Sequence, residues 1–111
     1  MADTDRELLE MAARAAEIEL PNPTLRVTHM RGVAPKVWNP LTDDGDALRL
    51  AVKLNLAVVF HPVLNQALCR PYHTRDMDRE AREDAEKHAD PCAATRRAIV
   101  RAAAAIGEAM P

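Results

Sequence analysis

The residue types that bind metals or act as nucleophiles gather in the C-terminal half of this sequence. They are His61, Cys69, His73, His88 and Cys92. Their spacings match no compact zinc motif, such as two cysteines separated by two residues. Cys92 falls in the first turn of a predicted helix, but no sequence feature places a base beside it. We therefore predict no metal, no cofactor and no catalytic residue, and we do not expect an enzyme.

Asp43, Asp44 and Asp46 surround Gly45 and superficially resemble a calcium-binding loop. An EF-hand requires a glutamate at its twelfth position, which counted from Asp43 is Leu54. The carboxylates are better explained as a helix cap, because they would accept bonds from unpaired N–H groups near the positive end of the helix dipole. Two acids exceed what one cap needs, so Asp43 and Asp44 are candidate interaction residues.

Basic residues on the predicted last helix form a second candidate surface. They are Arg96, Arg97 and Arg101, and Arg49 and Lys53 could join them. A solvated helix face is the simpler explanation. The alternative is a nucleic-acid-binding surface, although the net charge of −2 and the pI near 6.1 give no overall attraction to nucleic acid.

The composition indicates one folded domain spanning residues 1–111. Hydrophobic residues make up 48% of the sequence and charged residues 29%, which is typical of a globular protein. No apolar run approaches the roughly 20 residues that span a bilayer. Two cysteines do not suggest a disulfide scaffold, and no signal peptide is recognised, so we expect a protein of the reducing cytoplasm.

A first helix is predicted to begin at Asp5. Thr4 and Glu7 match a capping box, in which each side chain satisfies the main-chain N–H group of the other residue. The helix is predicted to continue until Pro21 and Pro23 end it. Its expected packing stripe consists of Leu8, Met11, Ala12, Ala15 and Ile18.

Two further helices are predicted from their caps and apolar spacing. The central one follows Trp38, with Thr42 or Asp43 as its cap, and the last one has Asp90 as its cap and Pro91 at its first position. The central stripe is Ala47, Leu50, Ala51 and Leu54, with Arg49 and Lys53 on another face; the last stripe is Ile99, Ala103, Ile106 and Met110.

Four segments are predicted to be strands. Residues 24–31 alternate imperfectly between apolar and polar side chains, and residues 36–38 supply a second short strand. Residues 56–60, LAVVF, are rich in β-branched types and indicate a buried strand. Residues 65–72 are predicted to pair with it as a hairpin, in which Pro71 is restricted to an edge or to the strand end.

Residues 74–88 are mostly charged and leave two alternatives open. Charged side chains recur four residues apart, in the pairs Glu80 with Asp84 and Arg82 with Glu86. That spacing is compatible with an exposed helical turn, whereas the charge content alone is equally compatible with a mobile loop.

The predicted order is helix, strands, helix, hairpin, helix. Short connections around a small sheet indicate an α+β fold, with a short, mostly antiparallel sheet covered by three helices. Residues 38–56, WNPLTDDGDALRLAVKLNL, and residues 90–110, DPCAATRRAIVRAAAAIGEAM, resemble small phage and prophage proteins named for a phage ABA (alpha-beta-alpha) sandwich domain. The resemblance implies a small alpha-beta-alpha sandwich and a phage origin, but it implies no catalytic residues.

These observations favour a small non-enzymatic phage or prophage accessory protein that binds a host or phage protein, for example to interfere with a host or defence process. A nucleic-acid-binding regulator that uses Arg96, Arg97 and Arg101 is the alternative. We also expect a homodimer, because three aromatic residues give a thin core. Its expected contact faces are Ala12, Ala15 and Ala16 in the first helix and Ala102 to Ala105 in the last.

Overall fold

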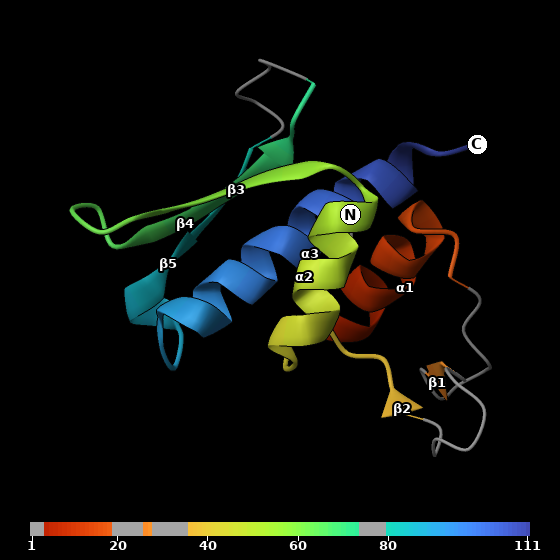
Figure 1. Cartoon of the computed structure of the whole chain (residues 1–111), viewed down its shortest axis with the longest axis horizontal. Coiled ribbons are helices and arrows are strands. Elements are labelled where there is room, and N and C mark those ends of the chain that lie inside the picture. The colour runs from red at the N-terminus through yellow and green to blue at the C-terminus, as the bar shows by residue number, and fades with distance from the viewer. Residues whose placement is uncertain (1–3, 19–25, 28–35, 74–79) are drawn as a thin grey trace.

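The last helix, α3 (Pro91–Ala109), is the element around which the others are arranged. In a computed structural model, which describes residues 4–18, 26–27, 36–73 and 80–111, α3 runs through the middle of the molecule (Figure 1). The other elements are α1 (Asp5–Ala15), β1 (Arg26–Val27), β2 (Lys36–Val37), α2 (Asp44–Lys53), β3 (Leu56–His61), β4 (Gln66–Pro71), β5 (Ala81–Asp84) and the short 3-10 turn η2 (Ala85–Lys87).

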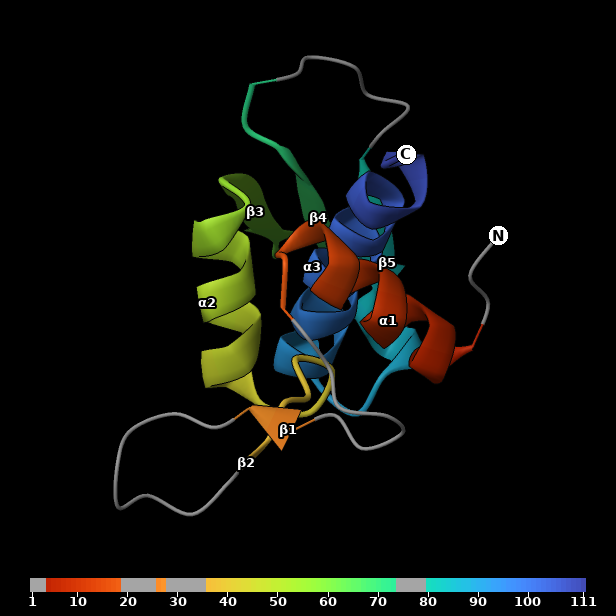
Figure 2. The same cartoon turned by 90° about the vertical axis from the view of Figure 1, so that its right-hand side faces the viewer.

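The strands β3, β4 and β5 form one antiparallel sheet in that order, and β1 and β2 pair separately. Helix α3 packs on all three strands of the larger sheet, α2 packs on α3 and β3, and α1 packs on α3. In Figure 2 the strands lie behind α3 and α1 lies in front of it. The predicted α+β class is confirmed, and the arrangement is consistent with a small alpha-beta-alpha sandwich.

Helix α1 begins where the capping box predicts and ends earlier than expected. The Thr4 hydroxyl accepts a hydrogen bond from the Glu7 N–H at 3.1 Å. The predicted end at the following prolines is wrong, because Glu17 adopts a left-handed φ of 57°. The N–H groups of Glu17 and Ile18 then bond back to carbonyls in the last turn, which is a Schellman motif.

The buried face of α1 is also shifted from the predicted stripe. Three of the expected residues, Met11, Ala15 and Ile18, are only partly buried. The buried face is the one that packs on α3. The two helices run in the same chain direction, with Asp5 in contact with Arg97 near one end of α1 and Arg14 in contact with Met110 near the other. The residues buried there are Leu8, Leu9, Ala12, Ala13 and Ala16.

Burial of α3 extends well beyond the predicted stripe. Ile99 and Ala103 are buried as expected, whereas Ile106 and Met110 are partly exposed. The buried set is Ala94, Ala98, Ile99, Val100, Ala102, Ala103, Ala104 and Gly107. Most of the alanines proposed as dimer faces are therefore used inside the chain, since α1 packs on α3 and α3 packs on the sheet. This overturns the reason given for the dimer, and self-association must use another surface.

Helix α2 follows its prediction closely. The Asp43 carboxylate caps it by accepting a hydrogen bond from the Asp46 N–H at 2.8 Å. Of the predicted stripe, Ala47, Leu50 and Ala51 are buried and Leu54 is partly buried, while Arg49 and Lys53 are exposed. The helix stops where Asn55 takes a left-handed φ of 56°, a conformation that asparagine tolerates. Trp38, just before α2, is buried in the core.

The predicted hairpin of β3 and β4 is confirmed, and Pro71 is the last residue of β4. The prediction that β3 is buried is wrong, because Val58 is 38% exposed and Val59 is 48% exposed. The cause is its position at the edge of the sheet. Helix α3 instead covers the central strand, where Ala67 and Cys69 are inaccessible to solvent.

The charged segment after the hairpin contains a strand that neither predicted alternative included. Residues 81–84 form β5, residues 85–87 form the single helical turn η2, and residues 74–79 lie outside the described part of the chain. Ala81 and Ala85 are buried. Between them, the Glu83 carboxylate contacts His88 Nε2 at 2.7 Å and the Arg101 guanidinium. Tertiary contacts thus fix this segment as a strand.

The two N-terminal strands are described in part. Arg26 pairs with Val37 and Val27 pairs with Lys36, in antiparallel register. Both short strands fall inside the segments predicted as residues 24–31 and 36–38. The remainder of the first segment lies outside the described residues.

Candidate functional site

The candidate interaction residues lie at the start of α2 and along α3, and the structure brings Asp44 and Arg96 together. Their closest atoms, Oδ1 and Nη1, are 2.6 Å apart. Arg96 Nε also donates a hydrogen bond to the Leu41 carbonyl at 2.8 Å. These contacts tie the N-terminus of α2 to the second turn of α3.

The other two arginines turn toward different elements. Arg97 contacts the Asp5 carboxylate of α1 at 2.8 Å. Arg101 pairs with the Glu83 carboxylate of β5 and donates to the Arg82 carbonyl at 2.9 Å. The predicted arginine surface is therefore divided among three elements, and each guanidinium lies beside a carboxylate. Nucleic-acid binding through these residues stays a prediction.

The aspartates around Gly45 have separate structural roles. Asp43 caps α2, and its carboxylate also lies 3.7 Å from Arg49. Asp46 is buried, which its place in a polar cluster did not indicate. Its carboxylate accepts hydrogen bonds from the Asn39 N–H at 2.9 Å and from Arg49 at 2.6 Å. A buried carboxylate with these donors secures the turn that leads into α2.

The metal-capable side chains are dispersed. Within residues 4–18, 26–27, 36–73 and 80–111, no group of three His, Cys, Asp or Glu side chains is placed to hold a metal ion. His88 contacts Glu83, and His73 Nε2 lies 2.8 Å from the Asn55 side-chain amide.

The two cysteines differ in their surroundings. Cys69 is inaccessible in the central strand, and burial raises the pKa of its thiol to about 12. It therefore packs as a small neutral apolar group. Cys92 is exposed in the first turn of α3. Of the two thiols, Cys92 is the accessible one.

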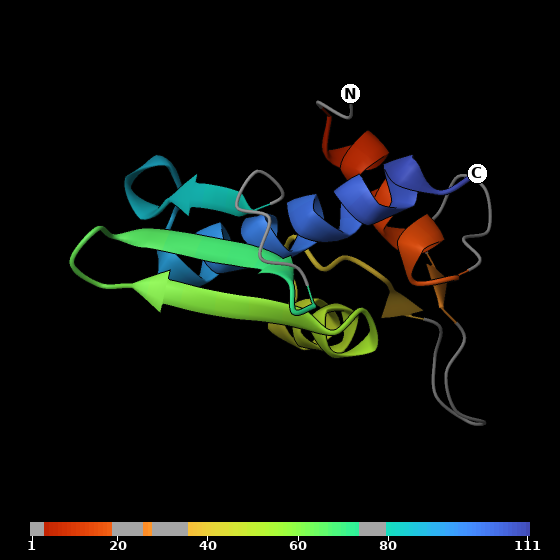
Figure 3. The same ribbon diagram turned by 90° about the horizontal axis from the view of Figure 1, so that it is seen from above.

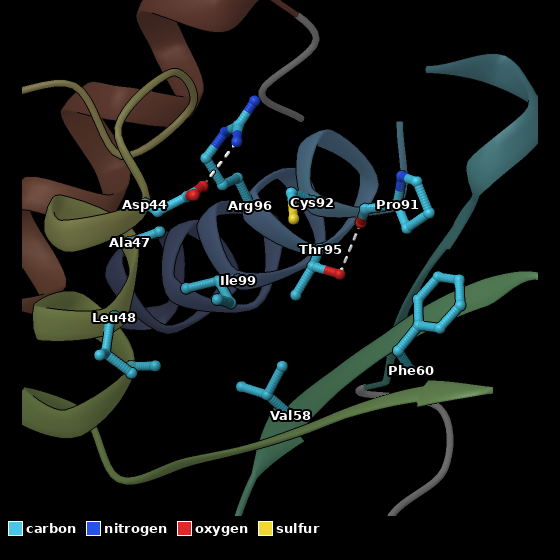
Figure 4. A pocket seen from close by; sticks show the side chains of 11 residues that line it. Asp44, Ala47, Leu48, Val58, Phe60, Pro91, Cys92, Thr95, Arg96 and Ile99 are labelled. Carbon is cyan, nitrogen blue, oxygen red and sulfur yellow. Dashed lines mark hydrogen bonds and ion pairs between the residues drawn. The ribbon is translucent and has the colours of Figure 1, made fainter. Parts of the chain in front are cut away.

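An apolar groove, here called the α2–β3 groove, opens between α2, β3 and the first half of α3. Its volume is about 380 Å³. Figure 4 shows Leu48 of α2 and Val58 of β3 on facing sides, with Ile99 of α3 between them. The lining residues are Asp44, Ala47, Leu48, Ala51, Val58, Phe60, Pro91, Cys92, Thr95, Arg96 and Ile99.

Most polar groups of the α2–β3 groove are already engaged with one another. Asp44 and Arg96 form their ion pair at one end. The Thr95 hydroxyl donates to the Pro91 carbonyl within α3, at 2.8 Å. The surface offered to a ligand is therefore mainly hydrocarbon, with the Cys92 thiol at its margin, and this surface suits apolar contact better than acid–base chemistry.

Sequence reasoning missed this groove, although α2 carries a signal for it. Leu48 is 64% exposed and Val52 is 72% exposed, and the two are four residues apart on one face. They form a second apolar stripe beside the one that packs on α3. When a helix has two apolar stripes and only one of them packs in the fold, the exposed stripe is typical of a binding surface.

No family model, curated protein or solved structure significantly matches the chain. The resemblance to the phage ABA sandwich family therefore stays a prediction. None of the helices in the described part of the chain combines the length and apolarity needed to span a bilayer.

Proposed function

We propose that this protein is a small non-enzymatic accessory protein that acts by binding another protein through the α2–β3 groove. The observation that supports this most strongly is the groove itself, an open apolar volume of about 380 Å³ between α2, β3 and α3. Apolar concave surfaces on small proteins are typical of binding sites.

A protein segment with apolar side chains fits this surface best. Leu48 and Val58 project into the groove from opposite sides and are both partly exposed. Each large apolar side chain that a partner buried against them would contribute about 1.5–3 kcal/mol. The Asp44–Arg96 ion pair lies at one end of the groove, where it would face polar groups of the partner.

We further propose that the partner is a host or phage protein of the bacterial cytoplasm, and that binding interferes with a host or defence process. The support is the resemblance of residues 38–56 and 90–110 to small phage and prophage proteins. Both segments contribute to the α2–β3 groove, the first through Leu48 and the second through Ile99.

Affinity capture from bacterial lysate tests this function with matched variants. The wild-type chain is compared with Leu48→Asp, which places a charge in the groove, and with Val63→Asp, which places the same charge at the hairpin tip, where Val63 is 94% exposed. We expect one protein to be retained by the wild type and by Val63→Asp and to be lost from Leu48→Asp.

The same experiment separates protein binding from nucleic-acid binding. Retention of the partner by Leu48→Asp would contradict binding in the groove. Recovery of nucleic acid that is lost on Arg97→Ala or Arg101→Ala would instead support the regulator alternative, since removing a phosphate contact weakens binding and its dependence on salt.

A further inference from the structure

We infer that two copies of this chain pair through the free edges of their β3 strands, joining two three-stranded sheets into one continuous antiparallel sheet. The strand of the second copy would lie beside the α2–β3 groove and lengthen its β3 wall. This inference goes beyond the proposed function, because it concerns the assembly state in which the groove works.

Among the described residues, β3 has β4 on one side and no strand on the other. In an antiparallel pair, alternate residues bond to the neighbouring strand. The Tyr72 N–H donates to the Asn55 carbonyl at 3.0 Å, and the register of β3 with β4 continues from this pair. Every second residue from Asn55 therefore bonds to β4. The intervening residues, Leu56, Val58 and Phe60, direct their N–H and C=O groups away from β4.

The two edges of the sheet differ in charge. Residues 56–60 of β3 contain no charged side chain, whereas β5 carries Arg82, Glu83 and Asp84 in succession. Charged residues on an edge strand oppose the addition of another strand. Pairing is therefore directed to β3, and it ends at two copies because the outer edges of the joined sheet are both β5.

The sheet is also too narrow to cover both helices that lie against it. Neighbouring strands are about 4.8 Å apart, whereas packed helices are about 8–10 Å apart. Helix α3 packs on all three strands, and α2 packs on the edge strand β3, where Figure 3 shows it nearly end-on beside the start of that strand. Leu48 and Val52 of α2 are left exposed there. A strand added to the β3 edge would extend the sheet toward them.

A second copy suits this position because its own β3 has the required properties. It is uncharged, and the side chains of Val58 and Phe60 face the groove. A two-fold interface is made from the same patch on both subunits, so each copy must both offer and accept the strand. Here the free edge and the exposed apolar residues of α2 adjoin on one surface. The symmetric register places Val58 opposite Val58 of the second copy, and Leu56 opposite Phe60.

Sedimentation equilibrium on the intact chain at low to high micromolar concentration tests the pairing. We expect the wild type to have twice the chain mass of 12.3 kDa. Val58→Lys should remain folded but sediment with the mass of one chain, because it places a charge at the centre of the interface. The matched control is Val59→Lys, on the neighbouring residue whose side chain faces the other side of the sheet; it should retain the doubled mass.

Amide hydrogen exchange gives a second readout that needs no variant. In the pair, the amides of Leu56, Val58 and Phe60 should be protected from exchange, as are the amides that bond to β4. When dilution separates the two copies, these three amides should lose their protection first. A wild-type chain with the mass of one chain at all concentrations would overturn the inference. The inference would also be overturned if both lysine variants kept the doubled mass. It would be overturned as well if Val59→Lys sedimented as a single chain while Val58→Lys kept the doubled mass. If the wild type had the mass of one chain but Leu48→Asp still lost the captured partner, the pairing would be contradicted and the proposed function would stand.

Discussion

Gly107 of α3 lies against the main-chain carbonyl of Met11 in α1, so closely that a Cβ atom at position 107 would be 1.9 Å from the carbonyl oxygen. The two helices therefore meet backbone to backbone at this point. A glycine is required there because any side chain would occupy the position of the Met11 carbonyl.

Gly107→Ala should destabilise the fold by forcing α1 away from α3. Overpacking of this kind costs about 1–3 kcal/mol. We expect a value near the upper end of this range, because the atoms that the new methyl group meets belong to the main chain of α1. Urea unfolding measures the loss. Gly45→Ala is the matched control, since the atoms nearest its added Cβ are side-chain atoms of Arg49 and Asp43 at 3.1–3.3 Å, and none is main chain. Equal stability of the two variants would show that the helices can separate at no cost.

Asp46→Ala should lower the free energy of unfolding by removing a buried acceptor. The Asn39 N–H would lose its partner at 2.9 Å, and Arg49 would lose its contact at 2.6 Å. The Asn39 N–H is partly buried, and a donor left without a partner away from water costs about 1–3 kcal/mol. Asp44→Ala serves as the comparison, because that carboxylate is largely exposed. A smaller loss for Asp46→Ala than for Asp44→Ala would contradict the role assigned to the buried carboxylate.

Asp90→Ala should cost about 1 kcal/mol, the usual effect of losing an N-cap. The Asp90 carboxylate accepts a hydrogen bond from the Ala93 N–H at 2.8 Å at the start of α3. Thermal and denaturant midpoints measure the change. Asp90→Ser, which keeps a capping oxygen, should recover most of the stability; no difference between the two variants would mean that the cap contributes nothing.

Burial of Cys69 should make the fold less stable in alkaline solution. The unfolded thiol ionises above its ordinary pKa of 9.0, whereas the folded thiol keeps its proton until about 12. Between these values the folded state binds more protons, so the free energy of unfolding falls as pH rises, by up to about 1.4 kcal/mol per pH unit. The fall should be smaller in Cys69→Ala. An identical pH dependence in that variant would exclude Cys69 as the cause.

Helix starts were predictable because their signals are local. Thr4, Asp43 and Asp90 each bond to an N–H group three residues ahead in the chain, so the cap needs nothing from the rest of the fold. The hairpin was predictable for a similar reason, since the β-branched, apolar segment of β3 is separated from β4 by only a short turn that includes Asn65.

The features that sequence reasoning missed depend on contacts between distant segments. β5 has a charged sequence and becomes a strand through pairing with β4 and the contact between Glu83 and Arg101. The apolar run of β3 was assigned to the interior, but its place at the sheet edge leaves Val58 open to the α2–β3 groove. Arg96 and Asp44 were predicted from the sequence as candidate interaction residues. Their ion pair joins positions 52 residues apart, and the sequence alone does not indicate it.

The packing of α1 on α3 joins parts of the chain that are far apart in sequence, with Asp5 bonded to Arg97 and Arg14 to Pro111. Closing so long a loop costs conformational entropy before the contacts between α1 and α3 can form. The hairpin of β3 and β4 closes over only a few residues. We therefore expect the hairpin and α3 to form the folding nucleus and α1 to dock after the rate-limiting step. Weakening the junction at Gly107 should accordingly accelerate unfolding and leave the folding rate nearly unchanged.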